Sequence, residues 1–164
     1  MQHPHGSLIS SGKSQEAGFK LIEQVDRKPD HMKEMRITLG ENLKVNARYK
    51  DYLIRTDQPE AAGGDGSHPS PFDLFLVSVG TCAGFYVKSF CRQRGIPEDK
   101  IELVQRMEVD KATRMITRVE IDILLPPEFP EKYKESVIKA AGACTVKKHI
   151  ASAPEFVLNT VTSK

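Results

Sequence analysis

The sequence predicts an α+β domain made of antiparallel sheets and one long central helix. Alternating apolar and polar residues mark short strands that come in runs, first three and later two, rather than singly between helices. Between the two runs lies a long apolar stretch with a helix-start signal before it and a helix-stop signal after it. The expected order is therefore β-β-β-α-β-β-α-β, and 164 residues suffice for about one such domain.

The first 30 residues are expected to be an extension that precedes a single domain over residues 31–164. Ser, Gly, Gln and Pro are scattered through residues 1–30, which are mostly polar. Within them, Ser14–Asp26 has the apolar spacing of a short helix, although Gly18 disfavours one. The composition changes at Met32, where the strand patterns begin.

The first run of strands consists of a hairpin and a third strand. Residues 35–39 and 43–49 alternate between apolar and polar side chains on either side of Gly40–Asn42, which is the pattern of a β-hairpin with a short turn. Tyr52–Thr56 continues the alternation as a third strand. Residues 57–69 are rich in Gly and Pro, so they predict a loop that leads into the central helix.

The central helix has clear signals at both ends. Ser70 is a good N-cap, Pro71 suits the first helical position, and Asp73 completes an acidic variant of the capping box. The helix is expected to run to Arg94, because Gly95 follows it. Nearly all faces of this helix are apolar and must be covered. A sheet of the same chain covers one side only, so the sequence favours a homodimer in which a partner subunit covers the other.

The second half of the domain is expected to hold two long strands, two helices and a last strand. Pro126 follows the second long strand and stops it. The helix before Cys144 carries its apolar residues on one face. The expected strands are Ile101–Val109, Met115–Leu125 and Glu155–Val161, and the expected helices are Glu131–Cys144 and a short one over Thr145–Ala151.

Composition excludes several kinds of partner. Lys and Arg number 24 against 22 for Asp and Glu, and no long basic run is present, so a nucleic-acid partner is not expected. The apolar run Leu74–Val87 is shorter than the ~20 residues of a membrane span. The N-terminus lacks the pattern of a secretion signal, and an odd count of 3 cysteines fits a reducing compartment, so the cytoplasm is expected. No histidine or cysteine spacing predicts a metal site, and no cofactor is expected.

The cysteines differ in their predicted settings. Cys82 and Cys91 are nine residues apart on one helix, so they point to opposite sides and cannot form a local disulfide. Cys91 is expected to be a buried side chain that fills space in the core near the end of the helix. Cys82 is surrounded by Gly80, Ala83 and Gly84, which allow another chain segment to approach closely. A further thiol, that of Cys144, ends the next helix on its apolar face, so the two inward-facing thiols of Cys82 and Cys144 can meet in the interior.

Two segments resemble the cysteine motifs of the OsmC/Ohr family, the osmotically inducible and organic-hydroperoxide-resistance proteins. Ser70–Cys82, SPFDLFLVSVGTC, resembles the first-cysteine motif, and Ala140–Lys148, AAGACTVKK, resembles the second, which usually reads Cys-Pro-Val or Cys-Pro-Ile. The resemblance covers about Met32 to Thr162. It implies an intertwined homodimer with two long helices at its centre and two active sites at the interface.

The resemblance also implies an activity. Members of this family are cysteine-based peroxidases that reduce organic hydroperoxides with electrons from a small or protein-bound dithiol, such as a lipoyl group. Carried over to this sequence, Cys82 corresponds to the cysteine that attacks the peroxide and Cys144 to the cysteine that resolves its sulfenic acid as a disulfide. This chemistry requires no metal or organic cofactor.

The sequence departs from the family pattern beside the first cysteine. The hydroperoxide-resistance branch pairs that cysteine with an arginine and a glutamate, and the glutamate position is Phe72 here. Asp73 is the neighbouring carboxylate, with helix capping as its alternative role. Arg36, Arg48 and Arg55 are the candidates for the arginine, and Arg55 is favoured because it precedes the 57–69 loop.

The two alternatives to a peroxidase are a non-catalytic protein that binds a small hydrophobic ligand and a redox sensor of the same fold. In the first, the cysteines only pack in the interior. In the second, a disulfide changes the binding of a partner.

Overall fold

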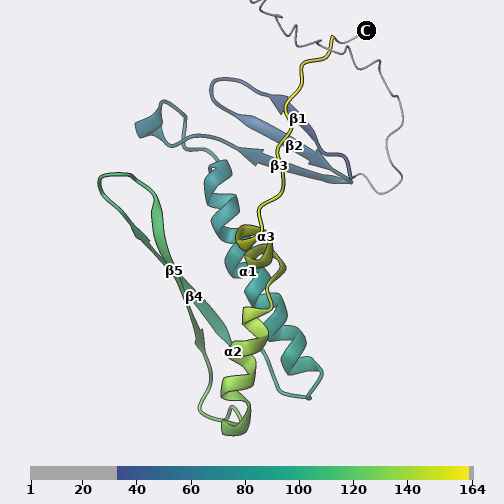
Figure 1. Cartoon of the computed structure of the whole chain (residues 1–164), viewed down its shortest axis with the longest axis vertical. Helices are drawn as coiled ribbons and strands as arrows, with labels where there is room; N and C mark the ends of the chain where they lie inside the picture. The colour runs from purple at the N-terminus through teal and green to yellow at the C-terminus, as the bar shows by residue number, and fades with distance from the viewer. Residues whose placement is uncertain (1–32, 163–164) are drawn as a thin grey trace, which may run out of the picture. The chain divides into compact units, whose positions relative to one another are not determined.

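The computed structural model describes residues 33–162, and from Met35 onward the chain forms one unit, distinct from residues 1–34. The expected extension over residues 1–30, with its helix over 14–26, lies outside the described residues. Figure 1 shows the order of the elements, which agrees with the predicted α+β class. The elements are β1 (Arg36–Leu39), β2 (Val45–Tyr49), β3 (Tyr52–Thr56), the 3-10 turn η1 (Glu60–Ala62), α1 (Pro71–Arg92), β4 (Glu102–Val109), β5 (Ile116–Leu124), the 3-10 turn η2 (Glu131–Tyr133), α2 (Lys134–Gly142) and α3 (Thr145–Ala151).

The first three strands form an antiparallel sheet in the order β1-β2-β3, as the alternation predicts. Ile37, Ala47 and Ile54 stand opposite one another in the register and therefore share one face of the sheet. This face is apolar, yet Ile37 is 61% exposed and Leu39 is 87% exposed. The described part of the chain therefore leaves much of the apolar face of this sheet uncovered.

Helix α1 begins as the sequence predicts. The Ser70 hydroxyl accepts a hydrogen bond from the backbone N–H of Asp73, and the Asp73 carboxylate accepts one from the Ser70 N–H at 2.8 Å, so the capping box is complete. The helix ends at Arg92, two residues earlier than predicted. Gly95 then turns the chain with a φ of +63°, a conformation that glycine adopts without strain.

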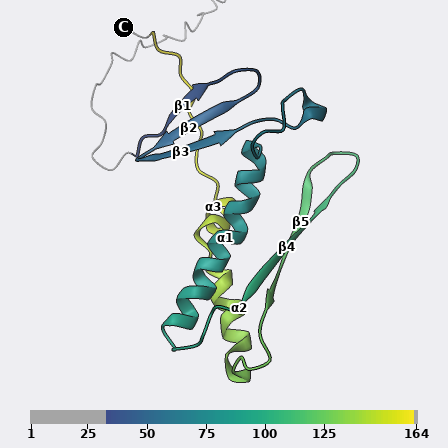
Figure 2. The same cartoon turned by 180° about the vertical axis from the view of Figure 1, so that it is seen from behind.

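The core lies between α1, α2 and the β4–β5 hairpin. Helices α2 and α3 and strand β4 pack on α1, and Figure 2 shows α2 alongside α1 from behind. Val87 and Val137 are the largest apolar side chains of the core that are almost fully buried. Each such side chain contributes roughly 1.5–3 kcal/mol of hydrophobic stabilisation. The cluster consists of Ala83, Val87, Phe90, Cys91, Ile96, Phe129, Val137 and Ala141.

The other side of α1 is exposed. Val77 is 55% exposed and Phe85 is 65% exposed. By length and composition α1 would suffice to cross a membrane, a property that it shares with core helices of soluble proteins. The apolar helix, Pro71–Arg92, is therefore longer than the apolar run Leu74–Val87 indicated. The uncovered side is the one for which the sequence predicts a partner.

Strands β4 and β5 form an antiparallel hairpin with an irregularity at Glu108 and Val109. Gln105 fastens this hairpin to α1, because its side-chain amide donates a hydrogen bond to the Leu76 carbonyl at 3.0 Å. A Cβ atom on Gly80 would lie 2.8 Å from the Gln105 Oε1 atom. Glycine at this position of α1 therefore allows the close approach of the hairpin.

One predicted element of the second half is shorter than expected, and another is wrong. The helix expected over Glu131–Cys144 starts as a 3-10 turn and ends at Gly142, because Cys144 has the extended backbone of an N-cap rather than a helical one. The short helix over Thr145–Ala151 is confirmed. The last strand expected over Glu155–Val161 is absent: this segment has no regular secondary structure and is exposed throughout. A strand requires a partner strand, and no described segment of the chain supplies one.

Candidate active site

Helix packing brings two of the three cysteines together. Cys82 lies in the middle of α1, and Cys144 is the N-cap of α3. The Tyr86 hydroxyl, one turn after Cys82, lies 2.8 Å from the Thr145 hydroxyl oxygen and ties α1 to the start of α3. The Cys144 thiol is fully buried, and its sulfur lies 3.9 Å from the Val79 carbonyl oxygen. Both thiols are free and lie within hydrogen-bonding reach of each other.

The surroundings of Cys82 favour its thiolate. Burial raises the pKa of the Cys82 thiol, but donors on α3 outweigh this effect and leave the pKa below its ordinary value. The donors are the backbone N–H of Val146, the Cys144 thiol and the backbone N–H of Thr145, and the charge of Lys147 adds to them. Hydrogen bonds to the charged form of a group and nearby opposite charges both stabilise that form. Cys82 is only partly buried, whereas Cys91 and Cys144 are buried.

Cys91 has the opposite setting on the same helix. It is fully buried in the core, and burial together with the charge of Glu98 raises the pKa of its thiol, against a smaller lowering effect of Arg94. A neutral buried thiol behaves as a small apolar side chain. The prediction that Cys91 fills space in the interior is consistent with this setting.

A wide apolar groove borders the site. Its volume is about 1290 Å³, and its walls come from α1, β5, α2 and α3. Cys82 itself is not part of the lining, which includes its helix neighbours Val79 and Ala83. Phe72 and Phe75 stack on each other at one part of the wall, with 5.8 Å between their ring centroids. Further apolar lining residues are Leu76, Ile116, Val119, Ile121, Ile123, Leu124, Leu125, Ile138 and Ile150.

Neither of the other two predicted site residues is among the groups that act on the Cys82 thiol. The Asp73 carboxylate caps α1, and hydrogen bonds from the Ser70 hydroxyl and backbone N–H lower its pKa. Arg55 lies in β3 opposite Asn46, on the polar face that it shares with Arg36 and Arg48 in the register of the sheet. Catalytic roles for Asp73 and Arg55 stay predictions.

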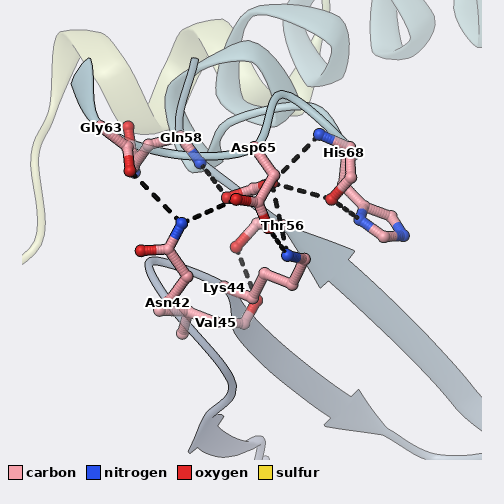
Figure 3. Close-up of polar contacts among 10 residues, drawn as sticks. Asn42, Lys44, Val45, Thr56, Gln58, Gly63, Asp65 and His68 are labelled. Carbon is pink, nitrogen blue, oxygen red and sulfur yellow. Dashed lines mark hydrogen bonds and ion pairs between the residues drawn. The ribbon is translucent and has the colours of Figure 1, made fainter. Parts of the chain in front are cut away.

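The loop before α1 is ordered by a polar network that the sequence did not indicate. Figure 3 shows Lys44 of the β1–β2 turn and Asp65 of the loop as partners, and Asn42 donates to the same carboxylate at 2.8 Å. At the centre lies Asp57, which is fully buried. It accepts hydrogen bonds from the Gln58 N–H at 2.8 Å and from both the N–H and the hydroxyl of Ser67.

These contacts determine the charge state of Asp57. Burial raises its pKa, but the hydrogen bonds from Ser67 and Gln58 and the charge of Lys44 lower it further, to about 2. The carboxylate is therefore ionised at neutral pH. It holds the two ends of the loop together at the point where the chain enters α1.

The sequence interpretation found the two thiols but missed the groups that act on Cys82. These groups are the backbone N–H donors of Thr145 and Val146 and the side chain of Lys147. The sequence did contain part of the information needed to find these donors, because a short helix was expected to begin at Thr145. A helix that begins directly after Cys144 exposes its first N–H groups beside that cysteine.

The family comparison agrees with this arrangement. The model of the OsmC-like protein family matches residues 64–159, which include both cysteines and the helices that carry them. The match covers more than half of the chain. The chain therefore belongs to the OsmC-like protein family.

Solved structures show the same fold at low sequence identity. A protein from Psychrobacter arcticus, described as an osmotic stress induced and detoxification response protein, is 22% identical with a TM-score of 0.64, over 76% of this chain and 90% of its own. A hypothetical protein from Aquifex aeolicus is 18% identical with a TM-score of 0.59, over 74% and 89%. An OsmC-like protein from Mycoplasma pneumoniae is 12% identical with a TM-score of 0.56, over 76% and 91%. A search of curated proteins gave no match.

Proposed function

We propose that this protein is a thiol peroxidase that reduces organic hydroperoxides to alcohols. The observation that carries the proposal is the Cys82 sulfur, which lies beside the Cys144 thiol and among donors that favour the thiolate. Membership of the OsmC-like family supports the same conclusion, since the family resemblance implies oxidative-stress and hydroperoxide chemistry. The thiolate is the nucleophilic form of cysteine, so a thiol with a lowered pKa beside a second thiol suits this reaction.

The first step is an attack by the Cys82 thiolate on the distal oxygen of the hydroperoxide. An S–O bond forms and the O–O bond breaks, so the alkoxide leaves and takes up a proton to become the alcohol. Cys82 is thereby oxidised to the sulfenic acid. The N–H groups of Thr145 and Val146 orient the thiolate before the attack.

The second step joins the two cysteines. The Cys144 sulfur attacks the sulfenyl sulfur of Cys82, an S–S bond forms and the S–O bond breaks, and hydroxide leaves as water. A small or lipoyl-type dithiol then reduces the disulfide by two exchange steps and is itself oxidised. No metal or organic cofactor takes part in this cycle.

The groove supports a substrate with an organic substituent. Its walls are mostly apolar, and the position that carries a glutamate in the hydroperoxide-resistance branch is Phe72, which lies in the groove wall. Burial of a hydrocarbon group gains roughly 25 cal/mol per Å². We therefore expect bulky hydroperoxides to react faster than hydrogen peroxide.

The active unit in this proposal is a homodimer in the reducing cytoplasm. The apolar faces of the β1–β3 sheet and of α1 are exposed within the described residues, which supports a second copy as their cover. Single exposed residues are normal on a monomer, whereas large continuous apolar faces mark interfaces.

The test is steady-state turnover of cumene hydroperoxide with dihydrolipoamide as the dithiol. We expect saturable turnover in the wild type, loss of turnover in Cys82→Ser, and retained turnover in the control Cys91→Ser. Absence of turnover in the wild type with every dithiol tried would overturn the proposal.

A second candidate is a non-catalytic protein that binds a small hydrophobic ligand. The volume and apolar lining of the groove favour it, as does Phe72 in place of a carboxylate. This candidate predicts that a fluorescent fatty acid binds equally well to the wild type and to Cys82→Ser, and that the wild type has no turnover. Turnover that depends on Cys82 contradicts it.

A further inference from the structure

Among residues 33–162, no arginine is one of the groups that lower the pKa of the Cys82 thiol. Arg48 and Arg55 lie on the polar face of the β1–β3 sheet, in register with Leu53 and Asn46. The cationic group whose charge acts on the Cys82 thiol is instead that of Lys147. This lysine was not among the site residues that the sequence indicated.

The position of Lys147 follows from the start of α3. Cys144 is the N-cap of this helix, so Lys147 is its third helical residue. The first turn of α3 is fixed against the middle of α1 by two contacts on either side of Cys82: the Tyr86 hydroxyl lies 2.8 Å from the Thr145 hydroxyl, and the Cys144 sulfur lies 3.9 Å from the Val79 carbonyl oxygen. The Lys147 side chain lines the groove together with Val79 and Ala83, the neighbours of Cys82 on α1.

The other charged groups around the groove are engaged or lie elsewhere on its wall. Lys134 pairs with Glu131 at 2.6 Å, and Asp122 pairs with Arg106. Arg114 lies at the turn of the β4–β5 hairpin. Among residues 33–162, no carboxylate forms an ion pair with Lys147, so no carboxylate there competes with the Cys82 thiolate for its charge.

We propose that Lys147 is a positioning residue of the thiol site, whose ammonium group stabilises the Cys82 thiolate in place of the arginine and glutamate of the hydroperoxide-resistance branch. This role of Lys147 rests on the proposed function in one respect, namely that Cys82 is the reactive cysteine. The Cys144 thiol is the other titratable group that faces the Cys82 sulfur from α3. Because Lys147 is exposed to solvent, its effect is expected to weaken as salt is added.

The experiment compares Lys147→Gln with Lys148→Gln and Lys147→Arg in the full chain. Lys148 is the matched control, since it is the next residue of the same helix, is exposed, and is absent from the groove lining. The rate of alkylation of Cys82 by iodoacetamide is followed by peptide mass spectrometry across a range of pH. A lysine near a helix start is unfavourable for the helix dipole, so its removal does not weaken α3.

We expect Lys147→Gln to slow the alkylation of Cys82 several-fold at neutral pH and to move its pH profile upward. Lys148→Gln and Lys147→Arg are expected to keep the wild-type profile, and added salt to reduce the difference between Lys147→Gln and the wild type. An unchanged profile in Lys147→Gln would overturn the proposal. An upward shift in Arg55→Gln as large as that in Lys147→Gln would also overturn it, because the arginine would then share the role.

This readout does not depend on peroxide turnover. If the wild type fails to reduce hydroperoxides but Lys147→Gln still slows the alkylation of Cys82, the role of Lys147 stands and the proposed function fails. If turnover is present and the alkylation profile of Lys147→Gln is that of the wild type, the function stands and the role of Lys147 fails.

Discussion

The middle of α1 and its C-terminal end hold the same residue type in opposite chemical settings. Cys82 in the middle is partly buried and meets N–H donors and a cation from α3, which lower the pKa of its thiol despite burial. Cys91 near the end is fully buried, and burial and the charge of Glu98 raise the pKa of its thiol. The difference arises from what packs on each part of the helix. The opposite pKa directions of the two thiols therefore follow from what packs against each of them, and not from the helix that carries both.

The largest expected effect is on the rates of alkylation of the two thiols. At neutral pH we expect iodoacetamide to modify Cys82 of the folded protein while Cys91 stays unmodified, since only the first combines access with a favoured thiolate. Because the pKa of Cys82 is lowered, its reactivity should persist to lower pH than that of a free cysteine. Peptide mass spectrometry measures both rates in one sample.

The control is the same protein in denaturant, where both cysteines should react at similar rates. If Cys91 reacts as fast as Cys82 in the folded state, the contrast between the two ends of α1 is wrong.

A smaller effect on the alkylation of Cys82 is expected when one of its hydrogen-bond donors, the backbone N–H of Thr145, is removed. Thr145→Pro removes the N–H that points at Cys82 but keeps the helix, because proline is tolerated at the first helical position and Cys144 already has a φ of −48° and a ψ of 122°. We expect the pKa of the Cys82 thiol to rise and its alkylation at neutral pH to slow several-fold. The same pH-dependent alkylation assay measures this change.

Thr145→Ala is the matched variant, since it loses the hydroxyl contact with Tyr86 but keeps the N–H. Equal rates in the two variants would mean that the donor on Thr145 has no part in the reactivity of Cys82.

A third prediction concerns stability rather than reactivity. Asp57→Asn removes the charge that the loop donors and Lys44 stabilise, so it should lower the thermal midpoint at neutral pH. The pKa of Asp57 is about 2 in the folded protein, below its ordinary 3.8. Its stabilising contribution is therefore complete above the ordinary pKa and is lost as the pH falls toward 2, where variant and wild type should converge.

Thermal unfolding at several pH values measures this effect, with Asp51→Asn, in the exposed turn between β2 and β3, as control. The reactivity difference between Cys82 and Cys91 should survive in Asp57→Asn at temperatures where it stays folded. A constant difference in midpoint from neutral to acid pH would show that the charge of Asp57 does not contribute.

The smallest expected effect is at Cys91. Glu98→Gln removes the charge that helps to raise the pKa of the Cys91 thiol, but burial is the larger cause. We therefore expect Cys91 to stay unmodified by iodoacetamide, and the thermal midpoint to change little, because the lost ion pairs with Arg92 and Lys88 lie at the surface. Rapid alkylation of Cys91 in this variant would show that charge, and not burial, keeps the thiol unreactive.

Local signals predicted those parts of the fold that depend on local contacts. The capping box at Ser70, the hairpins and the short helix after Cys144 all arise from residues close together in the sequence, and the structure contains them. The strand over Glu155–Val161 was predicted from alternation alone. Alternation does not show whether a partner strand exists, and the described chain provides none.

The candidate site, like the fold, was predictable only where local sequence patterns determine it. That the thiols of Cys82 and Cys144 meet was predicted from helix faces and motifs, and the structure brings them together. The donors of Thr145 and Val146 are backbone groups, which any residue other than proline carries, so the sequence did not reveal them. Asp73 was expected for two roles, and the structure shows the cap.

The central claim is that Cys82 attacks the peroxide and Cys144 resolves the product. The most direct measurement is the intact mass and disulfide map after one equivalent of cumene hydroperoxide, in the wild type and in Cys144→Ser. Serine is a favourable N-cap, so this variant should keep α3. We predict a Cys82–Cys144 disulfide in the wild type and a trapped sulfenic acid on Cys82 in the variant. An unchanged mass in both proteins would contradict the account.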